Sequence, residues 1–290
     1  MASFETAPMS SAGGSATPII GVFDSGFGGL TVLRALVARL PDARFVFIGD
    51  TARLPYGSKS RRTIARYAAQ SAQFLVQEQG AEFLVIACNT ASALALDAIQ
   101  AAVTVPVLGV IEPGATAARA ASRTGDVLVI ATDATVQSHA YAAASRARGL
   151  RALEKACPLL VPLVEEGWTD HPVTAEVIRV YLNELNAEAA AAGLNPDTLV
   201  LGCTHYPLLR PLIEGAVPAG MRVIDSAEAA AEAAVLQFGG GIAHAKSSGD
   251  QMTSMELRCF ATDSVEKFER LGSRFLGRPV GKVELVDLGG

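Results

Sequence analysis

The sequence lacks a hydrophobic run long enough to cross a membrane. Its 290 residues are 50% hydrophobic, yet no uninterrupted apolar stretch reaches about 18 residues. Residues 1–17 contain neither lysine nor arginine and have no apolar core, unlike a secretory signal peptide. We therefore expect a cytoplasmic protein with no membrane partner. The Ser-, Ala- and Gly-rich residues 1–17 are expected to be a disordered lead that catalysis does not need.

The sequence also lacks an excess of positive charge. Its 24 lysines and arginines stand against 29 acidic residues, which gives a formal net charge of −5. Binding to nucleic acid depends on contacts of lysine and arginine with phosphates. We therefore expect no direct nucleic-acid partner.

Cysteine is scarce, and no C-x-x-C pair occurs. The chain has four cysteines, and without an export signal they are expected to be free thiols in a reducing compartment. Cys157 and Cys259 are interpreted as small core hydrophobes. A metal site containing Cys203 and His205 would need further ligands from scattered positions, so no metal is expected.

The other two cysteines close matching segments. Residues 84–90 (LVIACNT) match residues 199–205 (LVLGCTH) position by position. Each segment is typical of a buried strand followed by a small residue, a thiol and hydrogen-bonding side chains. About the length of one small α/β domain separates them. Cys88 and Cys203 would then lie on two equivalent halves and face each other across a cleft. Such an arrangement suits a reaction that needs one base on each side of a carbon atom.

The pattern predicts an α/β fold, in which short apolar strands alternate with helices. Continuous apolar strands are typical of parallel sheets covered on both faces. The predicted strands are residues 19–23, 44–49, 83–87, 105–111, 127–131, 198–202 and 222–224. The predicted buried helix faces are Leu30, Leu33, Leu36, Val37 and Leu40, and then Val177, Val180, Tyr181 and Leu185, the second with Pro172 near its first turn.

Weaker matches extend the repeat. The strand ending at Asp24 has a counterpart in residues 129–132, and the strand leading to Tyr56 has one in residues 160–165. Ligands of open parallel sheets bind outside the carboxyl ends of the strands. The site is therefore expected at the seam between the halves, lined by Asp24, Tyr56, Cys88, Thr132, Glu165 and Cys203.

A glycine-rich turn at residues 26–31 raises the alternative of a dinucleotide site. Asp50 stands roughly where a ribose-binding acid would be expected. However, Thr31 replaces the third glycine, and Asp24 places a carboxylate where pyrophosphate would approach. A turn that holds a carboxylate-bearing or anionic ligand at a helix N-terminus is preferred.

Two other enzyme classes are alternatives for these residues. A cysteine–histidine hydrolase could use Cys203 and His205, but this leaves Cys88 without a role. A pyridoxal enzyme needs a Schiff-base lysine, and only Lys59 is expected near a candidate loop; it is interpreted as solvated. The remaining lysines are Lys155, Lys246, Lys267 and Lys282.

A two-thiol reaction requires that each thiol can act as a base. An unperturbed cysteine has a pKa of about 8.5, so only a few per cent is thiolate at neutral pH. Neighbouring charges and bases change this fraction. Asp24 is the candidate base for Cys88, and His205 or Glu165 is the candidate for Cys203.

With these residues placed, the chain resembles the cofactor-independent glutamate racemases from about residue 21 to residue 276. Several motifs in the same order carry the resemblance: residues 21–26, 49–57, 88–91, 109–113, 161–166 and 202–207. Leu54 departs mildly from the valine or isoleucine usual before Pro55. The tail beyond Gly239 matches poorly.

The resemblance implies interconversion of L- and D-glutamate without a cofactor, supplying D-glutamate for peptidoglycan. Cys88 would be the base for D-glutamate and Cys203 the base for L-glutamate. Asp24, His205 and Glu165 would assist them, with Glu166 as the alternative to Glu165. The substrate-binding positions would be Asp24, Ser25, Pro55, Tyr56, Gly57, Asn89, Thr90, Thr204 and His205.

The resemblance also implies two similar α/β domains related by pseudo-twofold symmetry, with the active site at their interface. Residues 18–111 and 225–290 would form the first domain and residues 112–224 the second. A homodimer is possible. Two alternatives stay open: a racemase of aspartate or another amino acid, and a non-catalytic regulator that binds a nucleotide or metabolite.

Overall fold

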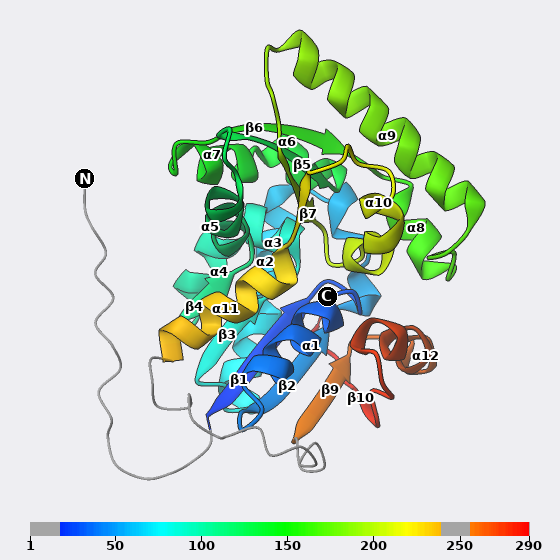
Figure 1. The fold of residues 1–290 in the computed structure, drawn as a ribbon. Helices are drawn as coiled ribbons and strands as arrows, with labels where there is room; N and C mark the ends of the chain where they lie inside the picture. The colour runs from blue at the N-terminus through cyan, green and yellow to red at the C-terminus, as the bar shows by residue number, and fades with distance from the viewer. Residues whose placement is uncertain (1–17, 239–255, 290) are drawn as a thin grey trace.

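The computed structural model describes residues 18–238 and 256–289. The prediction of a disordered lead at residues 1–17 lies outside these residues. Within them, ten strands form two wholly parallel sheets, which lie in separate halves of the molecule (Figure 1). The predicted fold class is therefore confirmed. None of the helices in the described ranges combines the length and apolar composition of a membrane span.

The first sheet has the order β10-β9-β2-β1-β3-β4. Its strands are β1 (Ile19–Asp24), β2 (Arg44–Gly49), β3 (Phe83–Ile86), β4 (Val107–Gly109), β9 (Leu257–Ala261) and β10 (Val283–Leu285). Strand β9 pairs with β2, so the end of the chain returns to the first sheet.

The second sheet has the order β6-β5-β7-β8. Its strands are β5 (Asp126–Ala131), β6 (Arg151–Ala156), β7 (Thr198–Gly202) and β8 (Arg222–Asp225). The central strand β5 pairs with both β6 and β7. The predicted domain boundaries and the pseudo-twofold relation stay predictions.

All seven predicted segments contain strands, but β6, β9 and β10 were missed. The proposed counterpart at residues 160–165 is wrong as a strand, because Leu160–Glu165 forms helix α8. The strand in that position is β6, an edge strand whose residues are exposed or half-buried. Its charged sequence has no apolar run that would reveal it.

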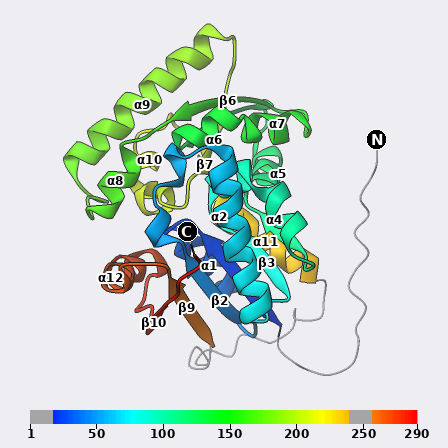
Figure 2. The same ribbon diagram turned by 180° about the vertical axis from the view of Figure 1, so that it is seen from behind.

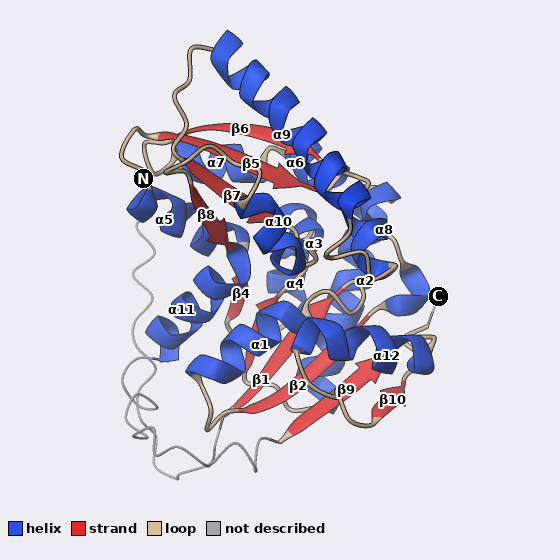
Figure 3. Cartoon of the chain, turned by 45° about the vertical axis from the view of Figure 1, so that its right-hand side comes forward, coloured by secondary structure: helices blue, strands red, loops and turns tan. Residues whose placement is uncertain are grey.

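Helices cover both faces of the sheets (Figures 2 and 3). They are α1 (Leu30–Arg39), α2 (Arg61–Gln73), α3 (Asn89–Leu94), α4 (Leu96–Ala102), α5 (Ile111–Ala121), α6 (Asp133–Ser138), α7 (Ala140–Arg146), α8 (Leu160–Glu165), α9 (Pro172–Ala191), α10 (Arg210–Glu214), α11 (Ser226–Phe238) and α12 (Val265–Leu276). A π-helical turn at Phe74–Glu78 extends α2.

Helix α1 buries the predicted face, whereas α9 does so only in part. In α9, Leu185 is buried and Val177 and Tyr181 pack against the core, but Val180 is 46% exposed. The buried residues of α9 are Thr174, Ile178, Leu182, Leu185 and Ala189. Apolar residues occur on more than one side of α9, so its sequence does not specify which side faces the core.

The alternation of side chains along β1 explains how the first sheet is covered. Ile20 and Val22 share a core with α1 and α12, whereas Phe23 belongs to the core under α2 and α4. Successive residues of a strand point to opposite faces, so an uninterrupted apolar run is needed when helices lie on both. The core under α1 continues to Leu128 and Leu201 of the second sheet, which joins the two halves.

Candidate active site

Cys88 lies between β3 and α3 and caps the helix. Its Sγ accepts a hydrogen bond from the amide of Ala91 at 3.4 Å, and its thiol donates to Ser25 Oγ at 3.4 Å. The side chain is buried. Burial, assisted by the negative charge of Asp24, raises the pKa of the Cys88 thiol to about 12. Without a ligand, Cys88 is therefore a neutral thiol at neutral pH.

Asp24 ends β1 next to Ser25 and is 2% exposed. Its Oδ2 accepts the amide of Gly26 at 2.9 Å, while the buried Oδ1 has no hydrogen-bond partner. Burial raises the pKa of the carboxyl group, although His205 and nearby backbone amides oppose the rise. A buried carboxyl oxygen without a partner is costly and therefore a candidate ligand contact.

Cys203 follows β7, as Cys88 follows β3. Its Sγ lies 4.0 Å from Nδ1 of His205, which is also 3.3 Å from Oγ1 of Thr204. Nε2 of His205 lies 3.3 Å from Oε1 of Glu165 in α8. Burial lowers the pKa of His205, but Cys203 and Glu165 outweigh it and raise the pKa to about 10. At neutral pH the ring is therefore an imidazolium that donates from both nitrogens.

Glu165, rather than the exposed Glu166, reaches His205. Its second oxygen, Oε2, lies 3.7 Å from Nζ of Lys267 in α12. Burial raises the pKa of Glu165, yet His205 and Lys267 together hold it below its usual value. Glu165 is therefore a carboxylate at neutral pH.

The two halves meet through side chains that flank the cysteines. The hydroxyl of Thr31 donates to the carbonyl of Thr204 at 3.0 Å, and that of Tyr141 to Oδ1 of Asn89 at 2.7 Å. Nδ2 of Asn89 is buried and has no partner. The site thus contains an unused amide donor and, at Asp24, an unused carboxyl acceptor, as a zwitterionic ligand requires.

Three hydroxyls close a triangle at the same seam. Oγ1 of Thr90 lies 3.1 Å from that of Thr132 and 3.2 Å from that of Thr135, which are 2.9 Å apart. Thr90 comes from the half of the first sheet and the other two from that of the second. The structure therefore places Thr90 and Thr132 together, as the predicted site requires.

The loop after β2 contributes mainly structure. The hydroxyl of Tyr56 donates to Oδ2 of Asp50 at 2.5 Å, while Oδ1 of Asp50 accepts from Thr262 at 3.0 Å. Asp50 thus fixes Tyr56 instead of binding a ribose, a role that the sequence did not reveal. Pro55 is exposed and its carbonyl accepts from Lys59 at 3.3 Å. The space beside Gly57 is open.

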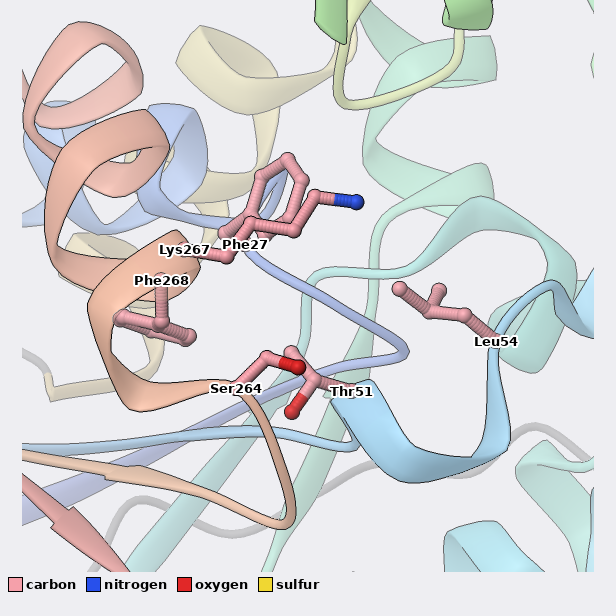
Figure 4. A pocket seen from close by; sticks show the side chains of 6 residues that line it. All are labelled: Phe27, Thr51, Leu54, Ser264, Lys267 and Phe268. Atoms are coloured by element: carbon pink, nitrogen blue, oxygen red, sulfur yellow. The ribbon is translucent and has the colours of Figure 1, made fainter.

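A pocket opens beside this loop, between Leu54 on one side and Lys267 with Phe27 on the other (Figure 4). Lys267 also lines a second pocket, together with Glu165 and Glu166. The expectation that only Lys59 lies near a candidate loop is therefore wrong. Lys267 was missed because α12 belongs to the poorly matching tail, where no motif marked it.

Among the described residues, no group of three histidine, cysteine or acidic side chains is arranged to hold a metal ion. Cys157 and Cys259 are buried, and burial raises the pKa of each thiol to about 12.

The family model of the Asp/Glu/hydantoin racemases matches residues 20–234. The chain belongs to this family. It is 54% identical to a glutamate racemase of Koribacter versatilis (strain Ellin345), over 94% of this chain and 98% of that protein. The predicted resemblance to glutamate racemases, which are isomerases, is therefore confirmed.

Solved structures of racemases have the same fold. Glutamate racemase isoform RacE1 of Bacillus anthracis is 37% identical with a TM-score of 0.83, covering 93% of this chain and 98% of that one. The Francisella tularensis enzyme in complex with D-glutamate is 35% identical with a TM-score of 0.81, covering 94% and 98%.

Proposed function

We propose that this racemase interconverts L- and D-glutamate without a cofactor, using Cys88 and Cys203 as a pair of acid–base groups. The observation that carries the proposal is the pairing itself. Each thiol follows a parallel strand of a different sheet, and each has its own ionisable neighbour, Asp24 or His205. The names of the relatives supply the substrate.

The reaction needs one thiolate and one thiol. With L-glutamate, the Cys203 thiolate takes the α-proton, and the Cys88 thiol donates its proton to the opposite face of the carbanion. The product is D-glutamate, and the reaction leaves Cys203 as the thiol and Cys88 as the thiolate. The reverse reaction starts from the Cys88 thiolate. No electron transfer is needed.

The neighbours differ between the two sides. At Cys203, the imidazolium of His205 donates toward the sulfur and Glu165 balances its charge. At Cys88, the carboxyl group of Asp24 accepts a proton more readily than usual because burial raises its pKa. Binding of a substrate ammonium group would offset the charge that disfavours the Cys88 thiolate.

The polar groups around the cysteines suit the rest of the substrate. The unused Nδ2 of Asn89 and the hydroxyls of Ser25, Thr90 and Thr204 can hold the carboxylates. Donors directed at the α-carboxylate also stabilise the charge that develops as the proton leaves. The amides near Gly57 complete the proposed binding positions, with Pro55 and Tyr56 shaping the loop.

We further propose that the D-glutamate product is used to build peptidoglycan, as the resemblance implies. Residues 18–111 with 225–290, and residues 112–224, are proposed as the two domains that carry one cysteine each. Light scattering would test the possible homodimer.

Incubation of purified, cofactor-free protein with L-glutamate in deuterated water tests the activity. Optical rotation should decay to zero while deuterium replaces the α-hydrogen. The absence of both under reducing conditions would exclude the proposal. Faster turnover of aspartate in a substrate panel would favour the related racemase, and tight nucleotide binding without racemisation would favour a regulator.

A further inference from the structure

We propose that Lys267 is a positioning residue for the Cys203 side of the reaction, holding Glu165 so that its other oxygen faces His205. The inference rests on the proposed function of Cys203. Lys267 lies on α12, which follows β9 of the first sheet, whereas Glu165 and His205 belong to the half of the second sheet.

The contacts form one line of charges. Nζ of Lys267 lies 3.7 Å from Oε2 of Glu165, whose Oε1 lies 3.3 Å from Nε2 of His205. Nδ1 of His205 lies 4.0 Å from Sγ of Cys203. Because the two oxygens of Glu165 have different partners, the ammonium group fixes the rotation of the carboxylate. Without it, Glu165 can turn toward water.

Buried aromatic side chains pack around the ring of His205, so Glu165 is the neighbour whose orientation can change. Phe275 packs edge-on against the ring with centroids 4.9 Å apart, and Phe27 lies 6.2 Å away. Both phenylalanines are 1% exposed. Lys267 itself lies 5.7 Å from the centroid of Phe27, so the same half of the molecule supplies the aromatic walls and the ammonium group.

Exposure argues against a mainly structural role. The side chain of Lys267 is 48% exposed, and single ion pairs that water reaches contribute little to stability. Lys267 also lines both pockets beside the site. Its removal should therefore change the reaction more than the fold.

The test uses the two cysteine variants as separate half-reactions. Lys267→Met, added to Cys88→Ser, should slow exchange of the α-hydrogen of L-glutamate by about 10-fold, a fraction of a general acid–base contribution. Added to Cys203→Ser, Lys267→Met should leave the exchange rate of the α-hydrogen of D-glutamate within about twofold of that of Cys203→Ser alone. Lys267→Arg should restore the first rate, and Lys282→Met, at an exposed lysine, should change neither. Equal loss in both backgrounds, or loss in neither, would overturn the proposal.

A second measurement does not depend on the two-thiol reaction. Nuclear magnetic resonance of ¹⁵N-labelled histidine follows the titration of His205. The charged and titratable groups that act on its ring are Asp24, Cys203 and Glu165, and Lys267 acts through Glu165. In Lys267→Met, release of Glu165 should lower the pKa of His205 and change the ¹⁵N shift of Nε2. An unchanged titration would reject the positioning role of Lys267, whatever the exchange experiments show. If neither cysteine variant exchanged the α-hydrogen of glutamate, that result would separately reject the proposed function.

Discussion

Gly28 leaves no room for a side chain beside His205. A Cβ atom on Gly28 would lie 2.6 Å from Nδ1 of His205 and 2.4 Å from Oγ1 of Thr204. Both distances are far shorter than a van der Waals contact. Gly28 precedes α1 in the first half, so a glycine of one half allows the close approach of His205 from the other.

Gly28→Ala should therefore displace His205 from Cys203. We expect a loss of about 10²-fold in kcat, the effect of a misplacement of roughly 1 Å, and destabilisation by about 1–3 kcal/mol from overpacking. Steady-state kinetics and denaturant unfolding measure the two effects. Gly215→Ala is the control, since its Cβ would meet its nearest neighbour at an ordinary 3.5 Å. Unchanged kcat in Gly28→Ala would contradict this account of the site.

Cys88→Ser and Cys203→Ser should both racemise glutamate about 10²–10⁴-fold more slowly, because a serine hydroxyl is a poor base at neutral pH. Each should keep exchange of one enantiomer: Cys203→Ser that of D-glutamate, and Cys88→Ser that of L-glutamate. Deuterium incorporation followed by mass spectrometry separates these half-reactions. Cys157→Ser and Cys259→Ser, at buried positions outside the site, should racemise at nearly the normal rate. Normal racemisation by either of the first two variants would end the two-thiol mechanism.

Asp24→Asn should make the protein more stable at neutral pH and inactive. Burial raises the pKa of Asp24, so its ionisation opposes folding as pH rises through that pKa. The amide keeps an oxygen for the Gly26 amide and carries no charge. A gain of about 1–3 kcal/mol is expected from removing the desolvation cost of a buried charge, although the new Nδ2 takes the place of the unpartnered Oδ1. Urea unfolding at pH 7 measures it; a loss of stability would show that the Asp24 charge is compensated.

The link between His205 and Glu165 should stabilise the fold in a defined pH range. Against the effect of burial, Cys203 and Glu165 together raise the pKa of His205 from 6.5 to about 10 on folding. The contribution of His205 is therefore complete below pH 6.5 and is lost as pH rises through about 10. The pKa of Glu165 falls below 4.5, so its contribution is lost as pH falls below that value. The difference in unfolding free energy between the wild type and His205→Gln should thus be largest between about pH 5 and 6.5. A difference that grows toward pH 10 would reverse the sign of this linkage.

Much of the fold follows from local patterns in the sequence. The apolar run that contains Ile20, Val22 and Phe23 predicts β1 because both of its faces are covered. Strand β6 has no such run. At this edge of the sheet, Oε2 of Glu154 contacts Nδ1 of His139 at 3.2 Å, and Nζ of Lys155 pairs with Glu188 at 2.6 Å. Local periodicity does not predict β6, since the residues that contact its charged side chains come from other elements.

Part of the candidate site also follows from local patterns in the sequence. Strand ends and matching motifs predicted Asp24, Cys88 and Cys203 at the seam. The parallel strands β1 and β3 bring Asp24 and Cys88 to one edge of the first sheet, and β7 brings Cys203 to the corresponding edge of the second. The role of Asp50 as the partner of Tyr56 and the position of Lys267 depend on side-chain packing across the chain. The resemblance indicated Glu165 near Cys203; in the structure Glu165 contacts His205, which in turn lies beside Cys203.

The triangle of Thr90, Thr132 and Thr135 has a consequence for a reaction that runs in both directions. Each hydroxyl has one proton, and in each of the three contacts either oxygen can be the donor. The ring can therefore circulate clockwise or anticlockwise, and a rotation of the three O–H bonds reverses it without moving a heavier atom. Such a ring has no built-in polarity, so it joins the two halves equally well in either direction of its hydrogen bonds.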